Sequence, residues 1–176
     1  MHYSLALSLL VSVTSAAAQA DTAFVTPSGK VISVTLPAAQ QGFALDAKPP
    51  LLSGRDLDDR PSSAPTKRAG YFFSFVWCKP CAEAMAHFER GGWRLRDDLR
   101  FVYVNQQDTP GIIREYVVDE YLAGAFDVLR LDAASRARTQ VQSFPLTVVV
   151  DARRRVEAIY NGYDPAWVNA LLVAPA

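Results

Sequence analysis

The order of strand-like and helix-like segments predicts an α/β fold, in which a central mixed β-sheet is flanked by helices on both faces. Apolar, β-branched runs alternate with helix-like segments through most of the chain, which is typical of parallel strands joined by helices. The last two strand-like runs, at 146–150 and 156–160, are separated only by a short polar turn, which predicts an antiparallel hairpin. A sheet with both kinds of strand pair is mixed.

The first twenty residues have the pattern of an export signal. An apolar core at 5–13 is followed by small residues ending in Ala18-Gln19-Ala20, the A-x-A pattern of a signal-peptidase site. We expect cleavage after Ala20, although the preceding Met1-His2-Tyr3 holds no Lys or Arg. The alternative is a retained membrane anchor, for which the apolar stretch is short, because a span needs about 20 residues. We therefore expect a periplasmic or otherwise exported protein.

An N-terminal β-hairpin extension is predicted directly after this segment. Strand-like runs at 22–26 and 31–35 flank Pro27-Ser28-Gly29-Lys30, which has the composition of a turn. Residues 40–66 are rich in Pro, Ser, Asp and Gly, and predict mostly loop with a short strand near Leu51 and Leu52. The chain is thus divided into a signal peptide (1–20), a hairpin and loop extension (21–56) and a main domain (57–176).

The main domain continues with alternating elements. In chain order we predict a buried strand at 71–76, a helix at 82–90 ended by Gly91-Gly92, a strand at 100–105, a helix at about 111–124, a short strand at 128–131, a brief helix at 133–141, a central strand at 146–150, a strand at 156–160 and a last helix at 166–172. Caps and first-turn prolines mark three helix starts, at Asp108-Thr109-Pro110, Asp132 and Asp164-Pro165.

The composition is that of a folded domain with no bias toward nucleic acid. Half of the residues are hydrophobic and one fifth are charged, which indicates a packed core. The 18 basic residues balance the 18 acidic ones, so nothing in the net charge favours nucleic acid or an anionic membrane surface. The triplet Arg153-Arg154-Arg155 separates two strand-like runs and is interpreted as a solvated turn. We expect a monomer.

The two cysteines of the chain, Cys78 and Cys81, lie two residues apart where the aromatic strand passes into a helix. At a helix N-terminus, free N–H groups and the helix dipole favour a thiolate on the first cysteine. The second cysteine is close enough to form a disulfide with it. Such a pair exchanges electrons with other dithiols, and this redox-active disulfide needs no added cofactor.

Other uses of the two cysteines are weighed against this interpretation. A zinc site needs four ligands, and after signal cleavage the only further histidine is His87, so we expect no metal. Covalent haem attachment needs a histidine directly after the second cysteine, where this chain has Ala82. A purely structural disulfide would close a very short loop and would stabilise weakly.

Three motifs of the main domain point together to one family. They are Trp77-Cys78-Lys79-Pro80-Cys81 after an aromatic strand, the run Val-Gln-Ser-Phe-Pro-Leu-Thr at 141–147, and Val150-Asp151 before a polar turn and a strand. With these motifs, and with a similar turn at 57–62, residues 57–172 resemble the thioredoxin-fold superfamily. Within it they look like the exported TlpA/ResA-like thiol-disulfide oxidoreductases of bacteria. The resemblance implies a thioredoxin-like three-layer fold.

The resemblance also implies roles for the residues of the cysteine motif. Cys78 would attack a target disulfide as a thiolate, and Cys81 would resolve the mixed disulfide. Pro80 suits the first helical turn, where its missing N–H costs little. Lys79 would favour the thiolate by its charge, with simple solvent exposure as the alternative.

Three further residues are expected to shape the site. Trp77 would pack beside the cysteines and shield them. Phe144 and Pro145, joined by a cis peptide bond in the family, would present a backbone edge that docks an extended substrate segment. Trp167 on the last helix is interpreted as a core residue.

The chain departs from the family where relatives place an acid–base group. Phe72 occupies the position of a buried Asp, and Ala84 occupies the position of a Glu three residues after the second cysteine. Glu83 is a candidate substitute, although its helix phase is unfavourable. His87 lies nine residues after Cys78, which puts it on the opposite side of the helix, so we expect it to face solvent rather than to act as a base. The acid–base partner of Cys81 is left unassigned.

The expected function is that of an exported thiol-disulfide oxidoreductase acting on protein disulfides or thiols. A reductase is favoured, because reducing members of the family share a proline in the dipeptide between the cysteines, and its task would be cytochrome c maturation or protein disulfide repair. The resemblance implies a membrane electron donor of the DsbD/CcdA type. The alternatives are a thioredoxin-like binding module or chaperone that holds Cu(I) or an apocytochrome without turnover, and an inactive member with a structural disulfide.

Overall fold

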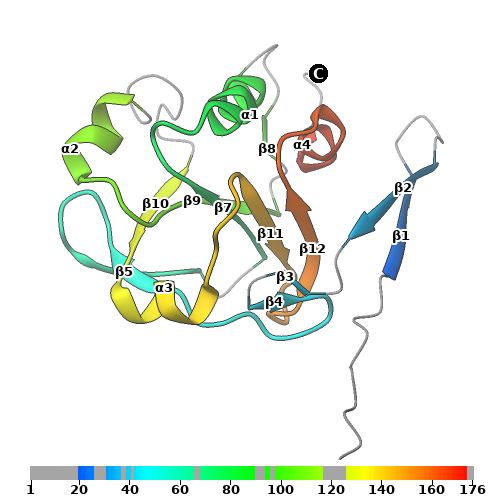
Figure 1. Ribbon diagram of the computed structural model, residues 1–176, viewed down its shortest axis with the longest axis horizontal. Helices are drawn as coiled ribbons and strands as arrows, with labels where there is room; N and C mark the ends of the chain where they lie inside the picture. The colour runs from blue at the N-terminus through cyan, green and yellow to red at the C-terminus, as the bar shows by residue number, and fades with distance from the viewer. Residues whose placement is uncertain are drawn as a thin grey trace, which may run out of the picture.

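A seven-stranded mixed β-sheet forms the centre of the fold (Figure 1). The computed structural model describes residues 20–25, 31–36, 39–40, 42–65, 68–89, 94–95, 98–116 and 126–173. In spatial order the strands are β12 (Val156–Asn161), β11 (Leu146–Val150), β7 (Ala69–Ser74), β9 (Arg100–Asn105), β10 (Asp127–Leu131), β5 (Ser53–Arg55) and β6 (Pro61–Ser63). Strand β9 runs parallel to both β7 and β10, and the other neighbours pair antiparallel. The predicted mixed sheet is confirmed.

Helices lie on both faces of this sheet (Figure 1). They are α1 (Lys79–Glu89), α2 (Pro110–Ile113), α3 (Ala133–Thr139) and α4 (Pro165–Leu171). One face packs against α1 and α4, whereas α3 lies on the other (Figure 1). Phe72 belongs to the buried cluster under α1 and α4, and its neighbour Phe73 belongs to the cluster on the opposite face. This division follows from the strand geometry, because successive side chains of β7 point to opposite faces.

The three predicted helix starts are confirmed, and Thr109 is the cap of α2. The side chain of Thr109 accepts from the Ile112 N–H, that of Asp132 from the Ser135 N–H, and that of Asp164 from the Ala166 N–H. These bonds satisfy donors that a helix leaves unpaired at its first turn. Helix α3 ends two residues before the predicted 141, because Gln140 adopts a left-handed conformation with φ of 51°.

The described residues before β7 contain more β-strands than their composition predicts. Strands β1 (Ala20–Val25) and β2 (Val31–Leu36) form the expected antiparallel hairpin, with Ala20 opposite Leu36. The following residues were expected to be mostly loop, yet β5 and β6 extend the central sheet there, and the turn between them contains the proposed domain boundary at 56/57. The strand expected near Leu51 and Leu52 starts at Ser53. Strands of three residues are too short for a period-2 pattern.

Two short strand pairs complete the described structure. Strand β3 (Ala39–Gln40) pairs with β4 (Phe43–Ala44), and β8 (Arg94–Leu95) pairs with β13 (Leu172–Val173). Four predictions concern residues outside the described ranges: the signal peptide up to residue 19, the turn at 27–30, the helix end at Gly91-Gly92 and the helical stretch at 117–124. In the described ranges, no helix has the length and apolar character needed to cross a bilayer.

Candidate active site

The cysteine pair lies where β7 leaves the sheet and α1 begins. Cys78 and Cys81 form a disulfide, with their Cα atoms 5.1 Å apart. Cys78 precedes the first residue of α1, so its sulfur lies at the helix N-terminus, and the Cys81 N–H donates to that sulfur at 3.3 Å. Cys78 is 5 % exposed and Cys81 is 2 % exposed, so Cys78 is the more accessible by a small margin. Free N–H groups and the helix dipole at this position favour a thiolate on Cys78.

The proline motif packs against the loop that carries the cysteines. The Phe144-Pro145 peptide bond is cis, as expected from the resemblance. The ring of Phe144 meets the ring of Phe75 edge-on, with centroids 5.1 Å apart. Phe75 lies three residues before Cys78, and its carbonyl accepts from the Cys78 N–H at 3.1 Å. The fold thus joins two motifs that are far apart in the sequence.

Trp77, directly before Cys78, lies at the surface, and its shielding of the cysteines stays a prediction. It is 69 % exposed, and its ring lies against Tyr116, with centroids 5.2 Å apart. Tyr116 follows α2 and is 39 % exposed. Lys79 and Pro80, in the first turn of α1, are also exposed. The surface beside Cys78 therefore presents an aromatic pair to solvent.

In the core beside the cysteines, the two positions where the family was expected to have a carboxylate carry Phe72 and Ala84. Phe72 is fully buried, and its ring neighbours include Phe88, Phe101, Tyr103 and Trp167, with centroids 6.0–6.5 Å apart. Ala84 is also fully buried, whereas Glu83 is exposed on α1. Burial raises the pKa of the Tyr103 hydroxyl. Glu83 therefore lies on the solvent side and does not fill the gap.

A carboxylate does approach the cysteine loop, from Asp108, which lies two residues before the first residue of α2. Oδ2 of Asp108 accepts from the backbone N–H of Val76 and from Nδ2 of Asn105, both at 2.8 Å. Asn105 is the last residue of β9 and is buried, and its Oδ1 accepts from the N–H groups of Gln107 and Asp108. The sequence signal for this arrangement is an Asn at the end of a buried strand and an Asp three residues later.

His87 is half-buried between α1 and α4, which corrects the expectation that it faces solvent. Its Nδ1 lies 2.9 Å from the hydroxyl of Tyr163, and its Nε2 lies 2.9 Å from Oδ1 of Asn169. Both partners come from the segment around α4, which helical periodicity within α1 cannot reveal. Its two ring nitrogens are engaged at the helix–helix contact. Trp167, as predicted, is a core residue.

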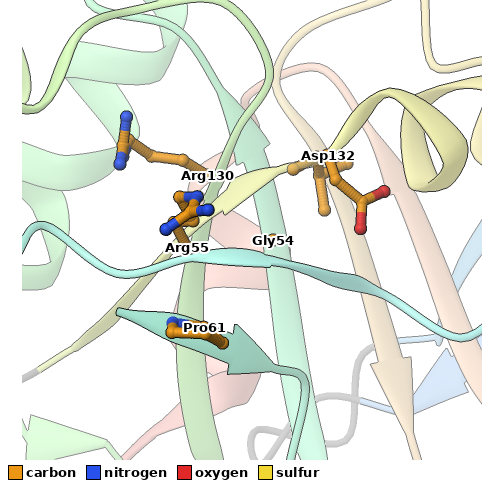
Figure 2. A pocket seen from close by; sticks show the side chains of 6 residues that line it. Gly54, Arg55, Pro61, Arg130 and Asp132 are labelled. Atoms are coloured by element: carbon orange, nitrogen blue, oxygen red, sulfur yellow. The ribbon is translucent and has the colours of Figure 1, made fainter. Parts of the chain in front are cut away.

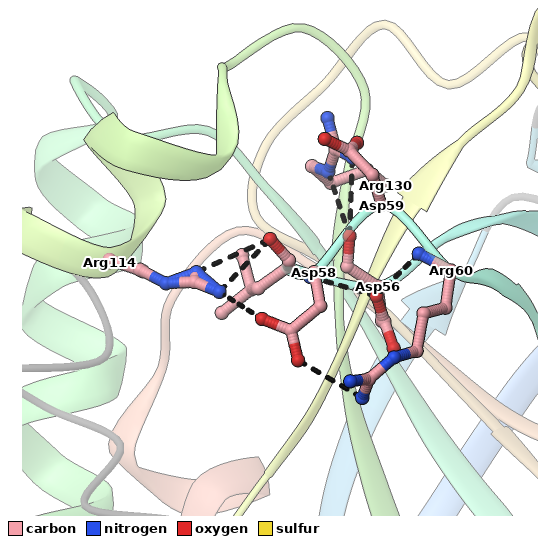
Figure 3. Close-up of polar contacts among 7 residues, drawn as sticks. Asp56, Asp58, Asp59, Arg60, Arg114 and Arg130 are labelled. Carbon is pink, nitrogen blue, oxygen red and sulfur yellow. Dashed lines mark hydrogen bonds and ion pairs between the residues drawn. The ribbon is translucent and has the colours of Figure 1, made fainter.

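The turn between β5 and β6 is held by an arginine–aspartate network (Figure 3). Arg114, after α2, donates to the carbonyl of Leu57 at 3.0 Å and pairs with Asp58. The hydrogen bond from Arg114, and then the charge of Arg60, lower the pKa of the Asp58 carboxyl. The side chain of Leu57 packs against the same apolar cluster that contains both cysteines. The turn that resembles the family's upstream turn is thereby attached to the cysteine face of the sheet.

A pocket of about 300 Å³ opens at the sheet edge, and its lining contains neither cysteine (Figure 2). It is lined by Gly54, Arg55, Pro61, Arg130, Leu131 and Asp132. Arg55 donates to the Asp59 carbonyl, and Arg130 donates to the Asp56 carbonyl at 3.2 Å and pairs with Asp59. Both arginines are therefore engaged in holding the turn. Among the described residues, no three His, Cys, Asp or Glu side chains gather as a metal site would require.

Comparison with family models and with curated protein sequences finds no match. Solved structures share the architecture. A thiol:disulfide interchange protein from Bacteroides sp. has a TM-score of 0.57 at 14% identity, over 73% of this chain and 88% of that chain. A thioredoxin family thiol:disulfide interchange protein from Chlorobium tepidum TLS has a TM-score of 0.55 at 15% identity, over 73% and 95%.

A third solved structure is a secreted Mycobacterium tuberculosis disulfide oxidoreductase that is homologous to E. coli DsbE. It has a TM-score of 0.51 at 21% identity, over 68% of this chain and 95% of that chain. At these identities the likeness concerns the backbone arrangement. The chain has the thioredoxin-like α/β fold that the three sequence motifs predicted.

Proposed function

We propose that this protein is an exported thiol-disulfide oxidoreductase that exchanges electrons with protein substrates through Cys78 and Cys81. The observation that carries the proposal is the Cys78–Cys81 disulfide at the N-terminus of α1, in a loop that packs against the cis Phe144-Pro145 segment. The three structural relatives described above are a secreted disulfide oxidoreductase and two thiol:disulfide interchange proteins, which supports the same chemistry and an exported location.

In the reducing direction the reaction has two exchange steps. The Cys78 thiolate attacks one sulfur of a substrate disulfide, so that a Cys78–substrate disulfide forms and the other substrate sulfur leaves as a thiolate that takes up a proton. The Cys81 sulfur, after losing its proton, attacks Cys78, which closes the Cys78–Cys81 disulfide and releases the second substrate sulfur. Two electrons pass to the substrate. The N–H of Cys81, 3.3 Å from the Cys78 sulfur, stabilises negative charge there.

We favour a reductase that is reloaded by a membrane electron donor of the DsbD/CcdA type and acts as a monomer without nucleic acid. Its task would be cytochrome c maturation or protein disulfide repair. The Lys79-Pro80 dipeptide supports this direction by its resemblance to reducing members of the family. The equilibrium direction depends on the reduction potential, because 30 mV changes the free energy of a two-electron exchange by about 1.4 kcal/mol. A potential close to −120 mV, that of a strong oxidant, would contradict the reductase direction.

A trapping experiment tests the proposed function. In Cys81→Ser protein the second step is blocked, so mixed disulfides with physiological substrates should accumulate on Cys78 and be identified by mass spectrometry after non-reducing electrophoresis. The matched control is the double variant Cys78→Ser/Cys81→Ser, which has no thiol and should trap nothing. If the single variant, expressed in its native host, traps no more than the double variant, the proposed function is wrong.

A further inference from the structure

We infer that Asp108 is a positioning residue for Cys78. By accepting a backbone hydrogen bond it fixes the loop from Phe75 to Cys78, so that the Cys78 sulfur faces the N–H groups at the start of α1. The inference deepens the proposed function and rests on it, since it concerns the same cysteine. Its basis is the hydrogen bond from the Val76 N–H to Oδ2 of Asp108, at 2.8 Å.

The sheet topology brings Asp108 to this loop. Strands β7 and β9 are parallel neighbours, and Ser74 at the end of β7 is opposite Asn105 at the end of β9. The carboxyl ends of both strands therefore lie at the same end of the sheet. The loop after β7 carries Cys78, and the loop after β9 carries Asp108. A residue far from the cysteines in the sequence thus contacts the backbone two residues before Cys78.

The carboxylate is itself held in place. Asn105 is 1 % exposed, and its Nδ2 donates to the same Oδ2 atom of Asp108 that accepts from Val76. Oδ1 of Asn105 accepts from the N–H of Asp108 at 2.8 Å, which turns the Asp108 side chain back toward β7. A buried asparagine that bonds both the backbone and the carboxylate of Asp108 restricts its rotation.

Loop geometry connects this bond to the sulfur. The Cys78 N–H donates to the Phe75 carbonyl at 3.1 Å, and the Cys78 sulfur accepts from the Cys81 N–H at 3.3 Å. Val76 lies within the turn that the first of these bonds closes, and Cys78, at the end of that turn, carries the sulfur of the second. Removing the acceptor of the Val76 N–H frees this turn, and the sulfur loses its alignment with the helix N-terminus. The thiolate of Cys78 is then less favoured.

The test separates the hydrogen bond from the charge. Asp108→Asn keeps one oxygen at the position where a single atom, Oδ2, accepts both bonds, whereas Asp108→Ala removes the acceptor. Each change is made in a Cys81→Ser background, so that Cys78 is the one thiol, and the rate of alkylation by iodoacetamide is measured from pH 5 to 10. Asp108→Ala is expected to shift the pH profile upward and to slow alkylation at pH 7 roughly threefold. Asp108→Asn should keep the pH profile of alkylation of the Cys81→Ser parent, or move that profile to lower pH.

Asp151→Ala is the matched control. The Oδ1 atom of Asp151 also accepts two backbone N–H bonds, from Arg153 and Arg155 at 2.8 Å, but in the turn at the opposite end of the sheet. It is expected to lower stability while leaving the alkylation profile of Cys78 unchanged. An Asp108→Ala profile identical to that of the parent, or an equal shift caused by Asp151→Ala, would overturn the inference.

A second measurement does not require a folded Asp108→Ala variant. In the oxidised wild-type protein the amide proton of Val76 should exchange with solvent slowly, and it should do so in Asp108→Asn as well. Rapid exchange of that amide in the wild type overturns the inference. Alkylation and amide exchange need no turnover, so a protein that traps no substrate but shows these effects would disprove the proposed function and keep the inference about Asp108.

Discussion

Tyr160 illustrates how burial acts on a single ionisable side chain. Its ring stacks on Trp167 with centroids 5.4 Å apart and an interplanar angle of 15°. Burial, and then the negative charge of Glu157, raise the pKa of its hydroxyl to about 12, against a smaller opposing effect of Arg68. The folded protein therefore holds the phenolic proton at a pH where the unfolded chain has lost it.

Stability should fall between pH 10 and pH 12 for this reason. The folded-state pKa of Tyr160 lies above the unfolded value, so its contribution is complete below pH 10 and is lost as pH rises toward 12. The loss is about 2 kcal/mol for a shift of this size. Urea unfolding at pH 9.5, 10.5 and 11.5 measures it. Tyr160→Phe should lose less stability than the wild type over this range, and an equal loss in both proteins would contradict the assignment.

Among the secondary-structure elements, the pairing of β5 with β10 depends on Gly54, because the absence of a side chain there lets the two strands approach closely. A Cβ atom built at this residue would lie 1.8 Å from the carbonyl oxygen of Arg130, a backbone atom that cannot move without disturbing the sheet. Gly54 pairs with Leu131, and β5 connects the edge strand β6 to the rest of the sheet. The absence of a side chain here is a requirement of strand pairing.

Gly54→Ala is expected to lower the free energy of unfolding by about 1–3 kcal/mol, the usual cost of overpacking. The matched control is Gly111→Ala in α2, where an added Cβ meets nothing within 4 Å. That change should be neutral or stabilising by up to about 1 kcal/mol, since alanine favours helix more than glycine does. Urea midpoints of the two variants compare them directly. Equal effects would mean that the contact with Arg130 relaxes freely.

At the scale of the whole molecule, the sheet separates two apolar clusters that neighbouring residues of one strand connect. Phe72 is buried in the cluster with both cysteines, α1 and α4, and Phe73 is buried in the cluster on the other face. Because β7 contributes to both clusters, loss of packing on either face removes support from the same strand. We therefore expect the main domain to unfold as one cooperative unit.

Phe72→Ala and Phe73→Ala test this cooperativity. Each removes a fully buried ring and should lower the free energy of unfolding by about 3–5 kcal/mol. Unfolding curves from far-ultraviolet circular dichroism and tryptophan fluorescence should coincide in each variant that still folds. Separate transitions for the two signals would show instead that the two faces unfold independently.

Residues with strong local signals were predicted well. Four of the five residues at 146–150 are β-branched and the run forms β11, and 100–105 forms β9 with the predicted bounds. Asp132 and Asp164 cap helices because the cap contact spans two or three residues of sequence. The weakest prediction was at 40–66, where β5 and β6 are held by pairing with β10 and by contacts of Arg114 and Arg130, all far away in the sequence.

The sequence by itself determined the position of the cysteine pair between an apolar strand and a helix, the central strands and the motif that ends in Pro145. These features depend on neighbouring residues, so spacing and periodicity carry them. Only the tertiary structure decided that Trp77 is exposed beside Tyr116, that His87 bonds across to α4, and that Asp108 reaches the cysteine loop. The reason is physical: these contacts join segments that lie far apart in the chain and meet only when the sheet has formed.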